Sequence, residues 1–335
     1  MTDDALDELI HRADLDGLVR LIDARCEHHD WDGLRRIRDR ARVAVATGRQ
    51  LWPASTLAEY RIALHAPAPW AVGVLTDDAG RFTIGPLSEV IAQHHTWEEL
   101  APELAARSDE VGLRARFVAH ERALRGDVVD DDELTGFPAV LEIPVAPRPW
   151  EPAYPVATYH DGGGEFPSPP APSVGPVVDL PTTRAETLDD PDVDGAVRHL
   201  VESWWVEGQG RVETTCVEGD APAAVGALGL RRARFAALDA ADALAWLGWA
   251  GASGGGHGRR RGAAAGRDGA WWVLGALGDL HHEWPPTDDA VEDLLADLRW
   301  WWWDADEPAT GWALRLAVED TAGGIAWAFN AGDAA

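Results

Sequence analysis

The first 65 residues place apolar side chains at the spacing of an α-helix. Residues 14–18 (DLDGL) and 30–34 (DWDGL) repeat one plan after sixteen positions, and each copy opens on an aspartate that suits a helix N-cap. Sixteen residues accommodate one helix and a short turn, so the pattern predicts a helical hairpin that resembles a repeat unit. Because a solenoid needs about three such units, we expect a helical bundle with a repeat-like start.

The helical pattern continues, with interruptions, to about residue 126. Thr96 and Glu99 stand at capping-box spacing at the start of a helical pattern, and residues 114–125 are again helical in pattern. Residues 76–80 (TDDAG) are typical of a turn, either in a short hairpin or between helix ends. We therefore predict an α-helical domain over residues 1–137.

Prolines dominate the next segment, which carries 12 of the chain's 22 prolines between positions 138 and 181. This density excludes a regular helix or a central strand, so residues 138–188 are predicted to be a linker or strap. Its aromatic residues Trp150, Tyr154, Tyr159 and Phe166 indicate that part of it packs on a domain surface. A disordered segment would carry fewer aromatic side chains.

The remaining residues, 189–335, mix alternating and helical patterns. The predicted strands are residues 211–217, 231–236, 300–303, 312–319 and 325–330, and the predicted helices are residues 220–228, 239–250, 259–280 and 291–298. Residues 307–311 would join two of the strands in an antiparallel hairpin. The fold class is thus α+β, with an α-helical N-terminal domain, a proline-rich linker and a C-terminal α+β domain that holds a small, mostly antiparallel sheet.

Composition excludes several chemistries. The chain has 57 acidic and 29 basic residues, a formal charge of −28, and no lysine. Without lysine there is neither a Walker-type phosphate loop nor a lysine Schiff base. The net negative charge argues against direct binding to nucleic acid.

Other absences point to a cytoplasmic chain without cofactors. The two cysteines, Cys26 and Cys216, have no metal-ligand spacing. No cofactor motif is present, and three adjacent histidine pairs (residues 28–29, 94–95 and 281–282) diverge too far on a helix to share a metal. The N-terminus lacks a signal-peptide pattern, and no apolar run reaches the roughly 18 residues of a membrane span. We expect a cytoplasmic protein with neither metal nor membrane contact.

The segment from Ser253 to Arg267 is the main candidate for chemistry. Its small residues would let backbone N–H groups approach a ligand, and its arginines suit carboxylate or phosphate. The candidate anion site consists of Ser253, Gly256, His257, Arg259, Arg260, Arg267 and Trp271. The alternative is a tightly packed helix, with glycines every four residues from Gly258 to Gly266, whose arginines pair with the chain's own carboxylates.

Two further patterns have competing interpretations. Residues 251–255 (GASGG) match the Gly-x-Ser-x-Gly of a hydrolase nucleophile elbow, but a capped helix, not a strand, is expected to precede the serine. The four tryptophans at 300–303 would alternate between the two faces of a strand, either for packing or as a stacking platform for a ligand or partner.

Several segments resemble an uncharacterised actinobacterial protein family. They are residues 255–267 (GGHGRRRGAAAGR), 303–305 (WDA), 310–312 (TGW), 316–320 (LAVED) and 50–53 (QLWP). The resemblance covers most of the chain outside the proline-rich segment. It implies one fold shared along the chain and carries no activity.

The leading functional hypothesis is a non-enzymatic binding protein. A protein partner would dock on the helical domain, where we expect an exposed apolar groove, and an anionic small molecule would bind the Gly/Arg segment. An enzyme acting on a phosphorylated or nucleotide-like substrate at that segment is the first alternative. An acidic antitoxin-like protein or nucleic-acid mimic, with carboxylates regularly spaced on one face, is the second.

Overall fold

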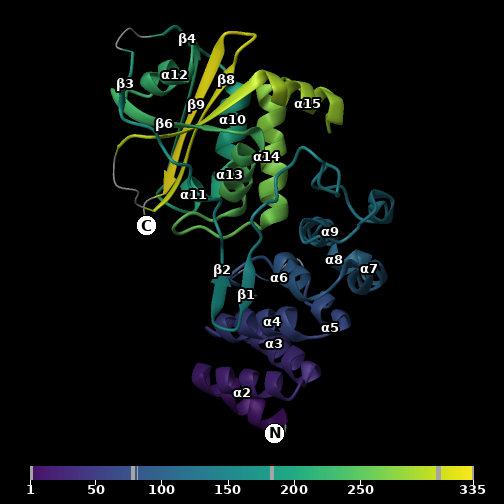
Figure 1. Cartoon of the computed structure of the whole chain (residues 1–335). Helices are drawn as coiled ribbons and strands as arrows, with labels where there is room; N and C mark the ends of the chain where they lie inside the picture. Colours follow the sequence, from purple (N-terminus) through teal and green to yellow (C-terminus); the bar gives the residue numbers. More distant parts are fainter. Residues whose placement is uncertain (1–2, 77–79, 81, 182–184, 307–310, 334–335) are drawn as a thin grey trace. The chain divides into compact units, whose positions relative to one another are not determined.

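The computed structural model describes residues 3–76, 80, 82–181, 185–306 and 311–333. The chain divides into two compact units. The first unit combines residues 1–140 with residues 157–165, and the second combines residues 141–156 with residues 166–335. Figure 1 draws both and labels their helices and strands where there is room.

The first unit is helical. Its elements are α1 (Asp3–Arg12), α2 (Leu15–Glu27), α3 (Trp31–Ala46), α4 (Trp52–His65), α5 (Ala68–Val72), α6 (Leu87–His94), α7 (Trp97–Ala106), α8 (Ser108–Val111), α9 (Arg114–Leu124), the 3-10 turn Asp131–Leu134, and a hairpin of β1 (Thr158–His160) and β2 (Gly163–Glu165). Helices α2, α3 and α4 pack on one another (Figure 1). Leu18, Ile22 and Leu34 have no exposed surface and form part of this unit's core.

The sequence repeat at residues 14–18 and 30–34 corresponds to the N-termini of helices α2 and α3. The carboxylate of Asp14 accepts a hydrogen bond from the Gly17 amide (2.8 Å), and that of Asp30 accepts one from the Gly33 amide (2.9 Å). A Cβ atom on Gly17 would lie 2.7 Å from an Asp14 carboxylate oxygen, so the glycine leaves room for the cap. The predicted capping box of Thr96 and Glu99 is also confirmed. The predicted turn at residues 76–80 lies mostly outside the described residues.

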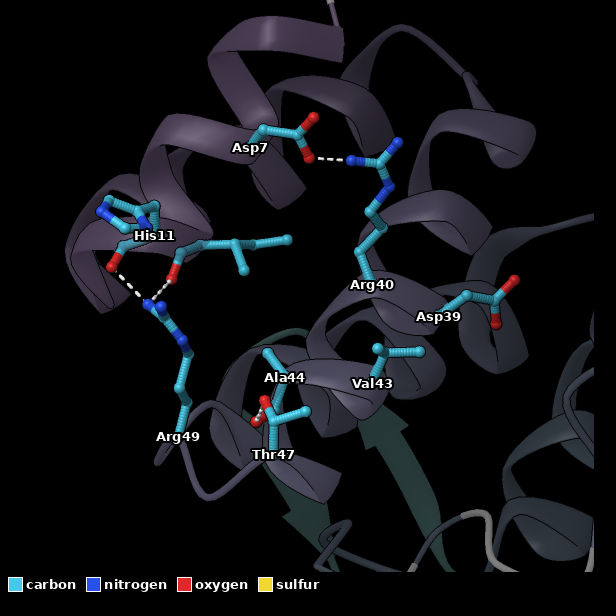
Figure 2. A pocket seen from close by; sticks show the side chains of 9 residues that line it. Asp7, His11, Asp39, Arg40, Val43, Ala44, Thr47 and Arg49 are labelled. Atoms are coloured by element: carbon cyan, nitrogen blue, oxygen red, sulfur yellow. Dashed lines mark hydrogen bonds and ion pairs between the residues drawn. The ribbon is translucent and has the colours of Figure 1, made fainter.

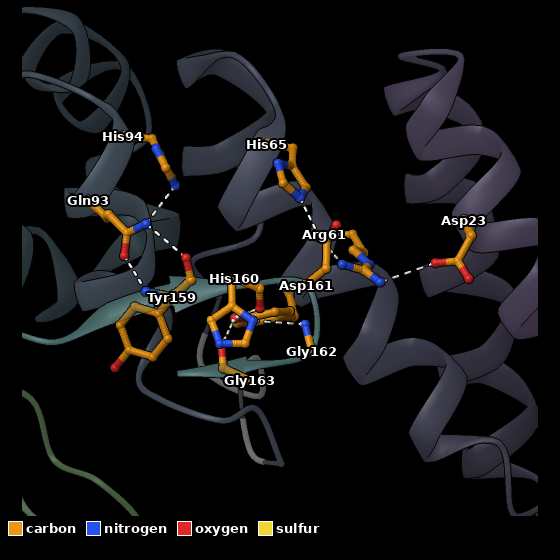
Figure 3. A network of polar contacts seen from close by, with 11 residues as sticks. Asp23, Arg61, His65, Gln93, His94, Tyr159, His160, Asp161, Gly162 and Gly163 are labelled. Atoms are coloured by element: carbon orange, nitrogen blue, oxygen red, sulfur yellow. Dashed lines mark hydrogen bonds and ion pairs between the residues drawn. The ribbon is translucent and has the colours of Figure 1, made fainter. Parts of the chain in front are cut away.

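The β1–β2 hairpin is fixed to the helices by side chains (Figure 3). The Gln93 side chain accepts a hydrogen bond from the Tyr159 amide and donates one to the Tyr159 carbonyl (2.9 Å), as a neighbouring strand would. The Tyr60 hydroxyl donates to the carbonyl oxygen of His160 (2.8 Å). The expectation that Tyr159 packs on a domain surface is therefore confirmed, since only 2% of it is exposed.

The second unit is built on an antiparallel sheet. In the described residues the strand order is β3-β6-β7-β8-β9-β5-β4, and every pairing is antiparallel. The strands are β3 (Val178–Asp179), β4 (Thr187–Leu188), β5 (Arg211–Glu218), β6 (Arg232–Leu238), β7 (Leu298–Asp304), β8 (Trp312–Asp320) and β9 (Ile325–Asp333), and the helices are α10 (Pro191–Leu200), α11 (Glu202–Val206), α12 (Ala221–Ala227), α13 (Ala240–Ala252), α14 (Ala263–Leu277) and α15 (Asp288–Asp297). The predicted α+β class is confirmed. The turn of the predicted β7–β8 hairpin lies mainly outside the described residues.

Both faces of this sheet are packed. Helices α10, α13 and α14 cover one face, where Leu247 and Leu274 share a core with Trp300 of β7 (Figure 1). Helix α12 covers the other face, where Val225 packs in a core that includes Trp303. The expected alternation of the four tryptophans is confirmed, and the tryptophans on both faces of β7 pack against a core.

Two sequence predictions need correction. The helix expected over residues 259–280 begins at Ala263, because Gly262 has a φ of +98° and cannot lie in an α-helix. Arg259, Arg260 and Arg261 therefore occupy a loop. The proline-rich segment is also more than a linker, since it supplies the β1–β2 hairpin of the first unit and the edge strands β3 and β4 of the second.

Candidate functional site

The Gly/Arg segment forms the connection between α13 and α14 and is tied down at its start. Ser253 is 2% exposed; its hydroxyl accepts a hydrogen bond from the Trp204 indole (2.9 Å) and donates one to the Ala250 carbonyl (3.0 Å). The Gly256 amide donates to the buried carboxylate of Asp333 (2.8 Å). A Cβ atom on Gly255 would lie 2.6 Å from the same carboxylate, so the small residues allow the loop to close around Asp333 and Trp204.

Arg267 binds the chain itself. It has no exposed surface, and its guanidinium forms two hydrogen bonds with the equally buried Glu151 carboxylate (2.6 and 2.7 Å). The same guanidinium also donates to three backbone carbonyls, those of Pro144, Val145 and Ala146. These hydrogen bonds hold residues 144–151 against α14, in agreement with the packing alternative for this arginine.

Of the other predicted site residues, Trp271 lies beside Arg267, whose guanidinium is 5.8 Å from the centre of the Trp271 ring. Trp271 is 1% exposed and contacts Trp150, with ring centroids 4.8 Å apart. The Arg259 amide donates to Glu207 (2.8 Å), the Arg260 guanidinium lies over the Phe166 ring, and His257 is exposed. The anion-site hypothesis therefore depends on His257, Arg259 and Arg260 alone, and it stays a prediction.

The capped helix expected before Ser253 is confirmed, so the segment does not form a hydrolase elbow. An elbow needs a strand entering and a helix leaving the serine. Ser253 instead caps the C-terminus of α13, and its hydroxyl is held by Trp204 and Ala250. His281 stacks on Trp272, with centroids 4.1 Å apart, and its Nε2 bonds the Trp272 carbonyl.

A carboxyl group beside this segment has a raised pKa. Burial raises the pKa of Asp268 on α14 to about 6, although Arg261 and Arg267 oppose the shift. Its folded-state pKa therefore lies above the ordinary value of about 3.9. The stability that Asp268 contributes is fully present below the unfolded pKa, and it is lost as pH rises through about 6.

Replacing Asp268 with asparagine should mimic the neutral form. We expect the free energy of unfolding to rise by roughly 2 kcal/mol at pH 8 and by about half as much at pH 5. Urea unfolding of wild type and variant at both pH values measures this. The same change at exposed Asp293 of α15 is the control. A gain that does not depend on pH would contradict the assignment.

Metal chemistry finds no support in the described part of the chain. Among these residues, no group of three or more His, Cys, Asp or Glu side chains is placed to hold a metal ion. Histidines of the adjacent pairs bond backbone carbonyls instead, as His95 does with Ala66 (3.0 Å).

An apolar groove lies between α1 and α3 of the first unit (Figure 2). Its volume is about 530 Å³. Ile10, Val43 and Ala44 supply its apolar surface, and Val43 is 67% exposed. At one end Arg40 pairs with Asp7, and at the other Arg49 donates to the carbonyls of Ile10 and His11 at the C-terminus of α1. The exposed apolar groove expected on the helical domain is thus present.

A second cavity of the first unit is mainly polar, and we call it the polar cavity. It has a volume of about 490 Å³ and is lined by Asp23, Cys26, Glu27, His29, Trp31, Arg61, His65 and Asp161. Figure 3 shows Arg61 between Asp23 and Asp161, with His65 beside them. Arg61 pairs with both carboxylates, and the His65 Nε2 lies 2.6 Å from Asp161.

His65 and Cys26 are two further titratable groups that line the polar cavity. Burial lowers the pKa of His65, and the positive charges of Arg61, His94 and His29 lower it further. Burial raises the pKa of the Cys26 thiol against the effect of Arg61, and the charges of Asp23 and Glu27 raise it further. The thiol is therefore not an activated nucleophile.

The sequence carried one signal for the polar cavity that pattern analysis missed. Asp161 and Gly162 form the two-residue turn between the paired residues His160 and Gly163, and Asp-Gly is a strong hairpin signal. That turn carries the Asp161 carboxylate to α4. Its partners Arg61 and His65 lie more than 90 residues earlier, so no local motif connects them.

Fold and cavities define an α+β protein whose helical unit carries an apolar groove and a polar cavity. The model of a family of unknown function, DUF6183, matches residues 16–334, and the chain belongs to this family. No curated protein and no solved structure matches the chain significantly. Within the described residues, no helix is long and apolar enough to cross a membrane.

Proposed function

We propose that the chain is a binding protein whose helical unit holds a basic, amphipathic helix of a partner protein in the α1–α3 groove. The observation that carries the proposal is the exposed apolar surface at Val43. Burying an apolar side chain of this size stabilises a complex by roughly 1.5–3 kcal/mol, and exposed apolar surface with a polar rim is typical of a docking site.

The shape and rim of the groove favour a helix as its occupant. Two helices form its walls, so a third helix can pack there with apolar residues at helical spacing, as in other helix-in-groove complexes. Ion-paired and charged side chains border the apolar floor at both ends (Figure 2). A partner helix with charges on its outer face would match this rim.

The overall charge favours a basic partner. At −28 the chain attracts positively charged proteins over distances of about a Debye length and accelerates their association. This attraction selects the sign of the partner's charge, and the groove supplies the apolar contact that holds it.

The test replaces Val43 with glutamate, with Val128→Glu as the matched control. Val128 is 95% exposed in the same unit and does not line the groove. We expect Val43→Glu to weaken partner binding at least tenfold, because a carboxylate would be buried without a partner, and Val128→Glu to leave binding unchanged. A photo-crosslinking residue at His11, on the groove rim, identifies the bound segment.

The identified segment then decides the proposal. A synthetic peptide of that segment should carry net positive charge and gain helicity on binding the wild type, as measured by circular dichroism. A segment that binds both glutamate variants equally well would overturn the groove assignment. Self-association that Val43→Glu abolishes, measured by light scattering, would make a second copy of the chain the occupant and also overturn the proposal.

A further inference from the structure

We propose that residues 166–173 of the second unit, here called the polyproline segment, are a ligand for a partner protein with an aromatic-lined groove that accepts a polyproline II helix. The segment shares no residue with the lining of the α1–α3 groove. Its backbone conformation, its pattern of exposure, its anchored ends and its lack of charge support this role.

The backbone conformation follows from the sequence of residues 166–172 (FPSPPAP), in which every residue is a proline or precedes one. A proline has its φ fixed near about −65°, and a residue before proline is restricted to extended conformations, so the run favours polyproline II. In the structure these residues belong to no helix or strand. Residues 167–173 form no backbone hydrogen bond with the described part of the chain, as is typical of this conformation.

Exposure along the segment repeats every three residues, which is one turn of a polyproline II helix. Phe166, Pro169 and Pro172 are buried or half-buried, whereas the residues between them are all exposed. One edge of the helix therefore packs on the second unit, and the other two edges face outward.

Pro167 and Pro170 lie on the same outward edge, one turn or about 9 Å apart. This is the Pro-x-x-Pro spacing that proline-recognition domains bind in their aromatic-lined grooves. The two proline rings would each pack between aromatic side chains of the partner.

Both ends of the segment are tied to the second unit. At its start, the guanidinium of Arg260 lies 4.9 Å from the centre of the Phe166 ring. Just beyond its end, the Gly175 amide donates a hydrogen bond to the Phe235 carbonyl (2.9 Å). A ligand that is already ordered loses less conformational entropy on binding than a free peptide does, so this anchoring favours recognition.

The segment is also uncharged. Residues 166–178 contain no acidic or basic side chain, although 26% of the chain's residues are charged. Exposed segments usually carry charged side chains. A neutral, proline-rich edge instead suits the apolar faces of aromatic rings.

The experiment uses a purified SH3 domain and a purified WW domain as probes, because both kinds of domain bind polyproline II ligands. Calorimetric titration with a synthetic peptide of residues 165–177 first selects the domain that binds this sequence more tightly. We expect the full chain to bind the selected domain at least as tightly as the peptide does, because its segment is already ordered.

Two double variants test the spacing. Pro167→Ala with Pro170→Ala should weaken binding at least about tenfold, because alanine lacks the ring that fills the groove. Pro176→Ala with Pro181→Ala is the matched control, since both prolines are exposed in the same unit and lie outside the Pro-x-x-Pro run. The control should bind as the wild type does. Thermal unfolding should show a similar, small destabilisation of both, because each variant loses two prolines.

Three outcomes would overturn the proposal. If neither domain binds the peptide, the sequence is not a polyproline ligand. If the peptide binds and the full chain does not, the prolines are inaccessible on the chain. Equal weakening by the two double variants would show that the Pro-x-x-Pro edge is not what the groove recognises. None of these outcomes bears on the α1–α3 groove, because that test depends on Val43.

Discussion

Replacing Arg267 with methionine is expected to lower the free energy of unfolding of the second unit by about 3–5 kcal/mol. The substitution leaves the fully buried Glu151 charged and without its cation, and breaking a buried pair from one side typically costs this much. Three backbone carbonyls of residues 144–146 lose their donor as well. Chemical denaturation followed by tryptophan fluorescence measures the loss.

The partner substitution shows whether buried charge is the cause. Arg267→Met combined with Glu151→Gln should recover part of the loss, because no uncompensated charge remains in the core. Arg198→Met provides the control, since its pair with Asp194 is exposed and is expected to contribute at most about 0.5 kcal/mol. A loss below about 1 kcal/mol for Arg267→Met would contradict the structural role of this arginine. In the variant, faster proteolysis within residues 144–156 would show that the segment has detached from α14.

Gly266→Ala is expected to destabilise the second unit by at least about 3 kcal/mol or to prevent its folding. Helices α13 and α14 cross at this residue, and a Cβ atom there would overlap the Gly248 carbonyl oxygen and lie 2.7 Å from the Ala252 amide nitrogen. Backbone atoms cannot move aside as a flexible side chain can. The clash therefore outweighs the gain of up to about 1 kcal/mol that alanine brings to a helix interior.

Gly195→Ala isolates that gain. Gly195 lies in α10, and a Cβ atom added there would have no neighbouring atom within 4 Å, so alanine should stabilise the chain by about 0.5–1 kcal/mol. Gly251→Ala gives an intermediate case, because its Cβ would lie 3.1 Å from the Gly266 Cα. In thermal unfolding, Gly195→Ala should therefore be the most stable of the three variants, Gly251→Ala intermediate and Gly266→Ala the least stable. Equal stability of Gly266→Ala and Gly195→Ala would show that the helices can separate without cost.

Local patterns predicted what local contacts determine. Asp14, Asp30 and Thr96 each cap a helix as expected, because a cap joins residues three apart in the sequence. The tryptophan strand β7 was evident for the same reason, since alternation is a local property.

The local patterns do not predict ion pairs between residues far apart in the sequence. Glu151 is 116 residues from Arg267, and Asp161 is 100 residues from Arg61. With 57 acidic residues, nothing in the sequence singles out the two carboxylates that these arginines select. The pattern predicts a helix from residue 259 because small residues and arginines are compatible with one. The positive φ of Gly262, which ends that possibility, is set by tertiary packing and not by composition.

The interleaved connectivity of the two units has a consequence for synthesis and for dissection of the chain. Residues 157–165 belong to the helical unit, whereas the residues on both sides belong to the other. During translation the helical unit cannot be completed when residue 140 emerges, because Tyr60 and Gln93 still lack the strand that they bind. A fragment that ends at residue 140 would leave these side chains without their partners. A fragment that ends at residue 165 includes every segment of the helical unit.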